Sequence, residues 1–182
     1  MRSRGFEVVK KYEMVEDFNT PIRSTAKSAG YDFIAFEDVT IEPMIFNMLK
    51  EMLQKCQQWF HIIARGEITD KDVTGCKPRV VWTGVKAYMG DDEVLYLYNR
   101  SSNPKKMGLV LANGVGVVDS DYYGNVDNDG EIGFAFYNIL PWKVTFHEGD
   151  RIGQAVFSTF LKADEDTASG ERKGGYGSTD KA

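Results

Sequence analysis

The stretch Asn99–Gly133 reads NRSSNPKKMGLVLANGVGVVDSDYYGNVDNDGEIG. Two short apolar runs, at 110–111 and 115–118, predict two β-strands with Asn113-Gly114 at a turn between them. Asp119 follows the second run directly, where a strand would end and a side chain can face a cleft. The stretch therefore predicts short strands with a carboxylate beside a possible site.

The rest of the chain shows the same alternation of short apolar runs and turn residues. Turn signals include Gly90-Asp91-Asp92 and Glu148-Gly149-Asp150. Further strands are expected at 6–9, 31–33, 39–41, 80–89, 94–98, 133–138, 143–146 and 152–160. Many short strands separated by turns predict an all-β barrel or jelly roll.

The segment 44–80 departs from this pattern. From Met44 to about Ala64 apolar residues recur at steps of four and three, which predicts a helix that begins after Pro43 and ends near Gly66. A polar loop follows, so the segment resembles an insertion into a β scaffold. We expect the helix to pack on its own subunit. The alternative is a protein-binding helix, because its stripe carries Trp59 and several Met residues that suit an interface.

Composition narrows the function classes. The 182 residues suit one domain with a sizeable core, and 42% of them are hydrophobic. The net charge of −5 argues against general nucleic-acid binding, so an anionic ligand would have to be met by local groups. The mixed, charged start at 1–11 does not resemble a signal peptide, and the longest apolar stretches are interrupted by polar residues. We therefore expect a cytoplasmic protein with no membrane segment.

Five short motifs occur in a characteristic order: Ala29–Asp32 (AGYD), Arg100–Ser102 (RSS), Asn113–Gly124, Gly149–Gln154 (GDRIGQ) and Gly174–Thr179 (GGYGST). This order resembles the dUTPase family, the trimeric all-β enzymes that cleave dUTP to dUMP and pyrophosphate. The resemblance covers the chain except for the insertion.

The resemblance implies a distorted jelly-roll β-barrel with one inserted helix and a flexible C-terminal arm. The domain would span 1–169, including the 44–80 helical insertion, and the mobile arm would span 170–182. The assembly would be a homotrimer in which the hairpin of one chain and the arm of another share each active site.

The same resemblance implies the site. Asp119 would be the catalytic base that holds the attacking water. Tyr122 would lie against the deoxyribose and leave no room for a 2′-hydroxyl, and the amide of Asn113 would read the uracil edge. The implied substrate-binding residues are Arg100, Ser101, Ser102, Asn113, Gly116, Tyr122, Gln154, Arg172, Tyr176, Gly177, Ser178 and Thr179.

A magnesium ion is the implied cofactor. Asp32 would contact it through water, since Mg²⁺ keeps several waters when substrate phosphates hold it. The arm departs from the common family pattern in two places: Arg172 is one residue closer to Tyr176, and Asp180 replaces a glycine.

Two other functions are considered. A regulatory protein of this fold could act through the 44–80 insertion, with or without activity. The related dCTP deaminases share the fold and an Arg-Ser-Ser motif, but the 119–122 segment and the Gly-rich arm resemble the dUTPase branch. The run from Asn125 to Gly130 imitates a calcium-binding loop; it is discounted because its closing position is Phe136 and its flanks are predicted strands.

Overall fold

The computed structural model describes residues 3–51, 53, 64, 66, 77–170 and 172. The strands are β1 (Gly5–Val8), β2 (Tyr31–Ile34), β3 (Val39–Ile41), β4 (Arg79–Trp82), β5 (Val85–Tyr88), β6 (Glu93–Asn99), β7 (Leu109–Leu111), β8 (Gly116–Asp119), β9 (Gly133–Asn138), β10 (Val144–Phe146) and β11 (Arg151–Thr159). Short helical turns occur at η1 (Lys10–Tyr12), η2 (Asn103–Met107) and η3 (Ser120–Tyr122). The predicted all-β class is confirmed.

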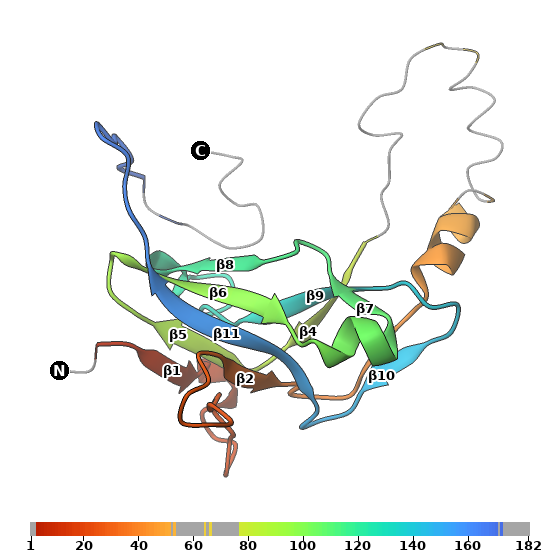
Figure 1. Cartoon of the computed structure of the whole chain (residues 1–182), viewed down its shortest axis with the longest axis horizontal. Helices are drawn as coiled ribbons and strands as arrows, with labels where there is room; N and C mark the ends of the chain where they lie inside the picture. Colours follow the sequence, from red (N-terminus) through yellow and green to blue (C-terminus); the bar gives the residue numbers. More distant parts are fainter. Residues whose placement is uncertain are drawn as a thin grey trace.

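Within the described residues, the strands form four antiparallel sheets. The largest has the order β2-β11-β6-β8, a second has the order β4-β9-β7, and β1-β5 and β10-β3 complete the barrel (Figure 1). The strand β11 is central because it pairs with β2 along one edge and with β6 along the other. The ends of β2, β6 and β11 are therefore brought together.

Aromatic rings fill the interior between the sheets. The fully buried rings are those of Phe33, Phe134, Phe136 and Phe146. Their centroids form a chain of contacts, 5.5 Å from Phe33 to Phe134, 6.4 Å from Phe134 to Phe136 and 5.5 Å from Phe136 to Phe146. These contacts join β2, β9 and β10 and make one continuous core.

Two sequence expectations about strands are wrong. The run 80–89 forms two strands, because the chain bends at Gly84 with φ of +69° and the Thr83 hydroxyl donates to the Ile132 carbonyl at 2.8 Å. As a result β4 pairs with β9, whereas β5 pairs with β1. The strands beside Asn113-Gly114 do not pair with each other, since β7 joins β9 and β8 joins β6. The turn itself is present, with Gly114 at φ of +68°.

The inserted helix is present in the described residues 44–51, 53 and 64; the rest of its predicted length lies outside the described residues. Figure 1 shows it at the end of the molecule opposite β1. In the part described, Ile45, Phe46 and Leu49 are about half exposed and Leu53 is 78% exposed. The expectation that the helix packs on its own subunit stays a prediction. No helix of the described residues has the length and apolar character needed to span a membrane.

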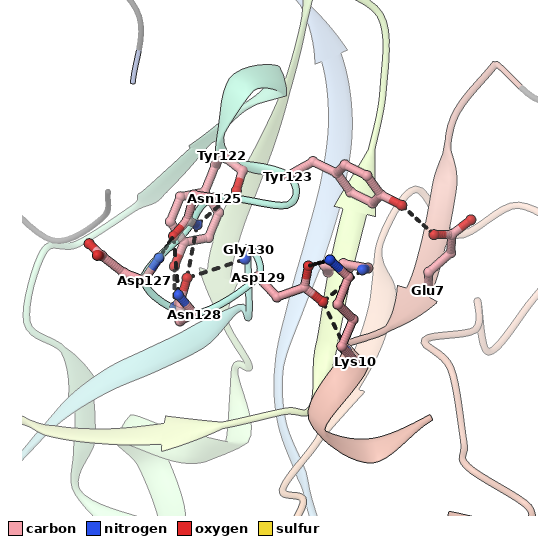
Figure 2. A network of polar contacts seen from close by, with 10 residues as sticks. Glu7, Lys10, Tyr122, Tyr123, Asn125, Asp127, Asn128, Asp129 and Gly130 are labelled. Carbon is pink, nitrogen blue, oxygen red and sulfur yellow. Dashed lines mark hydrogen bonds and ion pairs between the residues drawn. The ribbon is translucent and has the colours of Figure 1, made fainter. Parts of the chain in front are cut away.

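A buried ion pair fixes the loop 123–130 to β5. The Lys86 ammonium on β5 lies 2.7 Å from Asp129, and only 6% of the Lys86 side chain is exposed. Asp129 also accepts the Lys10 backbone N–H at 2.8 Å. Burial alone would raise the pKa of Asp129, but these two hydrogen bonds bring it below its ordinary value. On the same loop, the Tyr123 hydroxyl donates to Glu7 at 2.5 Å (Figure 2).

Replacing Asp129 by Asn should destabilise the protein by about 3 kcal/mol at pH 7, because the variant leaves the buried Lys86 charge uncompensated. Since the folded pKa of Asp129 is depressed, its contribution is present above about pH 4 and is lost as pH falls through the folded value. The difference between the two proteins should therefore shrink at pH 3. Urea unfolding at both pH values measures this.

The control is Asp127→Asn, which changes an exposed carboxylate of the same loop and should alter the free energy of unfolding by less than about 0.5 kcal/mol. An Asp129→Asn protein as stable as the wild type at pH 7 would show that the ion pair does not hold this loop.

Candidate active site

A cavity of about 180 Å³ opens beside the end of β8. Its lining includes five of the residues predicted from the sequence: Asn113, Gly116, Asp119, Tyr122 and Arg172. They come from the turn after β7, from β8, from η3 and from the C-terminal segment. The remaining wall is apolar, which suits a site that must exclude water around a few polar groups.

The local chain geometry explains why Asp119 faces this cavity. β8 ends at Asp119, and one 3₁₀ turn of Ser120–Tyr122 then reverses the chain, with the Tyr123 N–H donating to the Ser120 carbonyl at 3.4 Å. Asp119 stays about half exposed at the strand end. Gly116 is required by packing, because a Cβ there would lie 2.9 Å from the Cβ of Leu97. The strand can therefore pack closely against β6.

Tyr122 is the most firmly held residue of the cavity. Its ring is 8% exposed, and its hydroxyl donates to the Glu131 carbonyl at 2.9 Å. The same hydroxyl accepts from Asn128 Nδ2 at 2.8 Å (Figure 2). Burial raises the pKa of Tyr122, and the hydrogen bond from Asn128 partly offsets this rise. Asn125 Nδ2 also donates to the Tyr122 carbonyl at 2.9 Å.

The residues that hold Tyr122 were missed by sequence reasoning. They belong to the run Asn125–Gly130 that imitates a calcium-binding loop, in which the Asn125 and Asn128 side-chain oxygens accept hydrogen bonds from the loop itself. Asn125 Oδ1 accepts from the backbone N–H groups of Asp127 and Asn128, at 3.0 and 3.2 Å. Asx turns of this kind are signalled by closely spaced Asn and Asp residues. That spacing is the signal that could have identified the loop as the segment that holds Tyr122 in place.

A second group of predicted residues gathers where β2, β6 and β11 meet. Arg100 follows β6, and its guanidinium donates to the Arg151 carbonyl at 2.9 Å. The Arg100–Ser102 turn is held from below by the buried Asn103, whose Nδ2 donates to the Ile152 carbonyl at 2.7 Å and to Asn99 Oδ1 at 2.8 Å. The turn is thus fixed against β11 and leads directly into η2.

Asp32 and Gln154 belong to this second group. They are directly opposite each other on β2 and β11. A Cβ on Gly30 would come within 2.7 Å of Gln154 Oε1, so the glycine leaves room for that amide. The Asp32 Oδ2 atom accepts from the Ser24 hydroxyl and lies 3.3 Å from the Arg151 guanidinium.

The carboxylates of the described residues determine how a magnesium ion could be held. Within the described ranges, no cluster of three His, Cys, Asp or Glu side chains forms a metal cage. Asp32 Oδ1 is the carboxylate oxygen turned from both the Ser24 and Arg151 contacts, and a single carboxylate oxygen suits water-mediated contact to Mg²⁺. The residues therefore fit an ion that is held chiefly by other ligands.

The two groups lie far apart within one chain. In register, Asp32 is opposite Gln154, whereas Asp119 is opposite Val94 and, through it, Ser158. Three strand spacings separate them across the sheet, about 14 Å, and four residues of β11 separate them along it, about 13 Å. Asp119 and Asp32 are therefore roughly 19 Å apart on the same face of the sheet.

Arg172 joins the first group and not the second. Its guanidinium pairs with the Asp119 carboxylate and donates from Nε to Asp121 at 2.7 Å. The side chain is only 20% exposed, and Arg172 lines the cavity. The predicted arm residues Tyr176, Gly177, Ser178 and Thr179 lie outside the described residues.

Comparison with known proteins agrees with this architecture. The dUTPase family model matches residues 59–179. The chain is 43% identical over 181 residues to the deoxyuridine 5'-triphosphate nucleotidohydrolase of Lactococcus lactis subsp. lactis (strain IL1403), covering 98% of this chain and 99% of that protein. A shorter match, 42% over 89 residues, covers 46% of this chain and 55% of the enzyme of the same name from Desulfitobacterium hafniense (strain DSM 10664 / DCB-2).

Solved structures show the same fold. The dUTPase from Streptococcus mutans superposes with a TM-score of 0.65 at 36% identity, over 88% of this chain and 98% of that one. The dUTPase from phage phi11 of S. aureus, described with a species-specific insert, superposes with a TM-score of 0.61 at 16% identity, over 93% and 97%. With one relative alignable over nearly its whole length and the family motifs gathered at two sites of one sheet, the chain belongs to the dUTPase family.

Proposed function

We propose that this protein hydrolyses dUTP to dUMP and pyrophosphate. The observation that carries the proposal is that Asn113, Asp119 and Tyr122 line one cavity. Asn113 can hydrogen-bond to the uracil, Asp119 can hold the attacking water, and Tyr122 can pack against the sugar. The near full-length relative named as a deoxyuridine triphosphate nucleotidohydrolase supports the same substrate.

In the proposed reaction, Asp119 orients a water and accepts its proton. The water oxygen bonds to the α-phosphorus while the bond from that phosphorus to the oxygen bridging to the β-phosphate breaks, and pyrophosphate leaves. The half-exposed setting of Asp119 suits this role, because a water can reach the carboxylate from the cavity.

Selection of the nucleotide is assigned to Tyr122 and Asn113, which both line the cavity. Tyr122 packs against C2′ of the sugar, and the Asn113 amide with the neighbouring backbone pairs with the uracil edge. Gly114 needs its φ of +68° to form the turn that presents Asn113. A nucleobase whose hydrogen-bond donors and acceptors are reversed leaves these protein groups without partners and is therefore rejected.

The phosphates are assigned to Arg100, Ser101, Ser102 and Gln154, and the arm residues Arg172, Tyr176, Gly177, Ser178 and Thr179 complete the site. Guanidinium and hydroxyl groups at the end of β6 provide charge and hydrogen bonds to phosphate oxygens. Arg172 also pairs with Asp119. A triphosphate would compete for the guanidinium and release the carboxylate to accept a proton.

Asp32 would hold a magnesium ion through water beside the phosphates. When bound, the ion neutralises phosphate charge and orients the leaving pyrophosphate. The Ser24 and Arg151 contacts orient the Asp32 carboxylate beside this position.

The proposed assembly is a homotrimer with shared active sites, built from one barrel domain of residues 1–169 and an arm of residues 170–182. The support is the separation of Asp32 from Asp119, roughly 19 Å on one sheet. A single triphosphate is too short to touch both carboxylates. We therefore assign the phosphate-binding residues of each site to a neighbouring copy of the chain.

The insertion provides a surface for a protein partner of different sequence. Five of its described apolar side chains, Ile45, Phe46, Met48, Leu49 and Leu53, are exposed, and none of the proposed site residues lies within it. Apolar groups gathered on one exposed helix are typical of an interaction surface.

The wild-type protein should release pyrophosphate from dUTP in the presence of Mg²⁺, and far more slowly from UTP, dCTP or dTTP. Asp119→Asn should lower turnover of dUTP by about 10²–10⁴-fold while dUTP still binds, because only the proton acceptor is lost. Asp121→Asn is the matched control, since Asp121 also contacts Arg172 but is not part of the cavity wall. Equal turnover in Asp119→Asn and wild type would contradict the role of Asp119.

Mixing two inactive chains tests the shared site. Asp119→Asn lacks the base, and Arg100→Ala lacks a phosphate contact, so each homotrimer should be inactive. A 1:1 mixture should recover roughly a quarter of wild-type turnover, the fraction of neighbouring pairs that combine an intact base with an intact arginine. If exchange of subunits is demonstrated by native mass spectrometry and no turnover returns, each site belongs to one chain. A second mixture, with a chain lacking 170–182, decides which chain provides Arg172.

Replacing residues 45–77 by a short Gly/Ser linker should leave an active trimer. The linker is short because Met44 and Pro78 line the same cavity of about 200 Å³, so the two ends of the segment are neighbours. Light scattering and dUTP turnover measure assembly and activity. A monomeric or insoluble product would show that the helix belongs to the scaffold or to the trimer contact, and would remove the support for a separate partner.

A further inference from the structure

The hydroxyl group of Tyr122 is used entirely inside the protein. It accepts from Asn128 Nδ2 (Figure 2) and donates to the Glu131 carbonyl. The ring is therefore held at its far end while its body lines the cavity. The hydroxyl is therefore an anchor point and not a contact for the substrate. Among the side chains of the described chain, Asn128 is the one that donates to this hydroxyl.

Asn128 is itself prevented from rotating. Its Oδ1 atom accepts from Asn125 Nδ2 at 2.8 Å and from the Gly130 N–H at 3.2 Å, which orients Nδ2 toward Tyr122. Gly130 adopts φ of +83°, and a Cβ there would lie 2.7 Å from the Tyr122 carbonyl oxygen. The loop backbone thus lies directly against the backbone of Tyr122.

The loop is also tied to the barrel. Asp129, the next residue, forms the buried ion pair with Lys86 on β5, and the carboxylate of Glu131 accepts the Gly84 N–H at 3.0 Å. Burial raises the pKa of Glu131. Both contacts link the loop to elements beyond the cavity. The Asn128 amide is therefore held by a rigid frame and not by a freely moving loop.

We propose that Asn128 is a positioning residue for sugar selection: it fixes the depth of the Tyr122 ring in the cavity and so sets the discrimination between deoxyribose and ribose. The inference rests on the proposed function, in which Tyr122 packs against C2′. The Tyr122 ring can exclude a 2′-hydroxyl only if the ring is unable to move away from the sugar. Without the hydrogen bond from Asn128, the ring can move away from the sugar and admit the 2′-hydroxyl of UTP.

The test is a double-mutant cycle on the wild type, Asn128→Ala, Tyr122→Phe and the double variant. The ratio of kcat/KM for dUTP over UTP should fall about fivefold in each single variant, the effect of one neutral hydrogen bond. The double variant should show no further fall, because both changes remove the same contact. The dissociation constants of dUMP and UMP, measured by calorimetry on the same chains, should change in the same ratio.

Two further variants separate positioning from folding. Asn128→Asp keeps an oxygen that can accept from Asn125 and Gly130 but removes the amide donor, so it should also lower the ratio. Val126→Ala alters an exposed side chain of the same loop, 87% exposed, and should leave the ratio unchanged. Circular dichroism confirms that each variant is folded.

An Asn128→Ala protein that loses dUTP and UTP turnover by the same factor, with the ratio unchanged, would overturn the inference and leave only a structural role. Additive effects in the double variant would overturn it too. Failure of the proposed function is a different result: the wild type would bind dUMP more tightly than UMP without releasing pyrophosphate from dUTP, and the binding ratios would still test Asn128. Absence of any nucleotide binding by the wild type would overturn both.

Discussion

The close passage of β11 over the Phe134 ring is the constraint on which the sheet arrangement depends. A Cβ at Gly153 would lie 2.1 Å from the Phe134 ring, so only glycine permits this approach. The same residue pairs with Phe33 on β2 and with Asn99 on β6. One missing side chain therefore allows β11 to join two neighbouring strands while the aromatic core is packed beneath it.

The chemistry follows from this arrangement. Because β2, β11 and β6 meet around Gly153, Asp32, Gln154 and Arg100 gather at one end of the sheet. β8 pairs with the other end of β6, and Asp119 is consequently distant from them. The sheet that creates both groups also keeps them apart. In the proposed homotrimer the two groups of one site come from different chains, which would link catalysis to assembly through strand register.

The loop 123–130 beside Tyr122 is held in place by hydrogen bonds and an ion pair. Asn125 and Asn128 bond to the backbone of their own loop and to Tyr122, and Asp129 joins that loop to β5. Buried polar groups of this kind are tolerated because each is paired. The 44–53 helix has the opposite character, since Ile45, Phe46, Met48, Leu49 and Leu53 remain exposed.

The sequence by itself determined the all-β class, the strands β3 and β9 with their correct bounds, and the order of motifs that resembles the dUTPases. Local signals suffice there, because alternating apolar residues and turn residues act over a few positions. It also identified Asn113, Asp119 and Tyr122, which meet in one cavity. It did not predict the break at Gly84, since the β-branched run continues through it and the bend depends on Ile132, far along the chain. Only the tertiary structure decided that Asn128 holds Tyr122, that Lys86 pairs with Asp129 and that Asp32 stands apart from Asp119. These relations join residues through side-chain hydrogen bonds, burial and strand register, and no local pattern of residues encodes such long-range contacts.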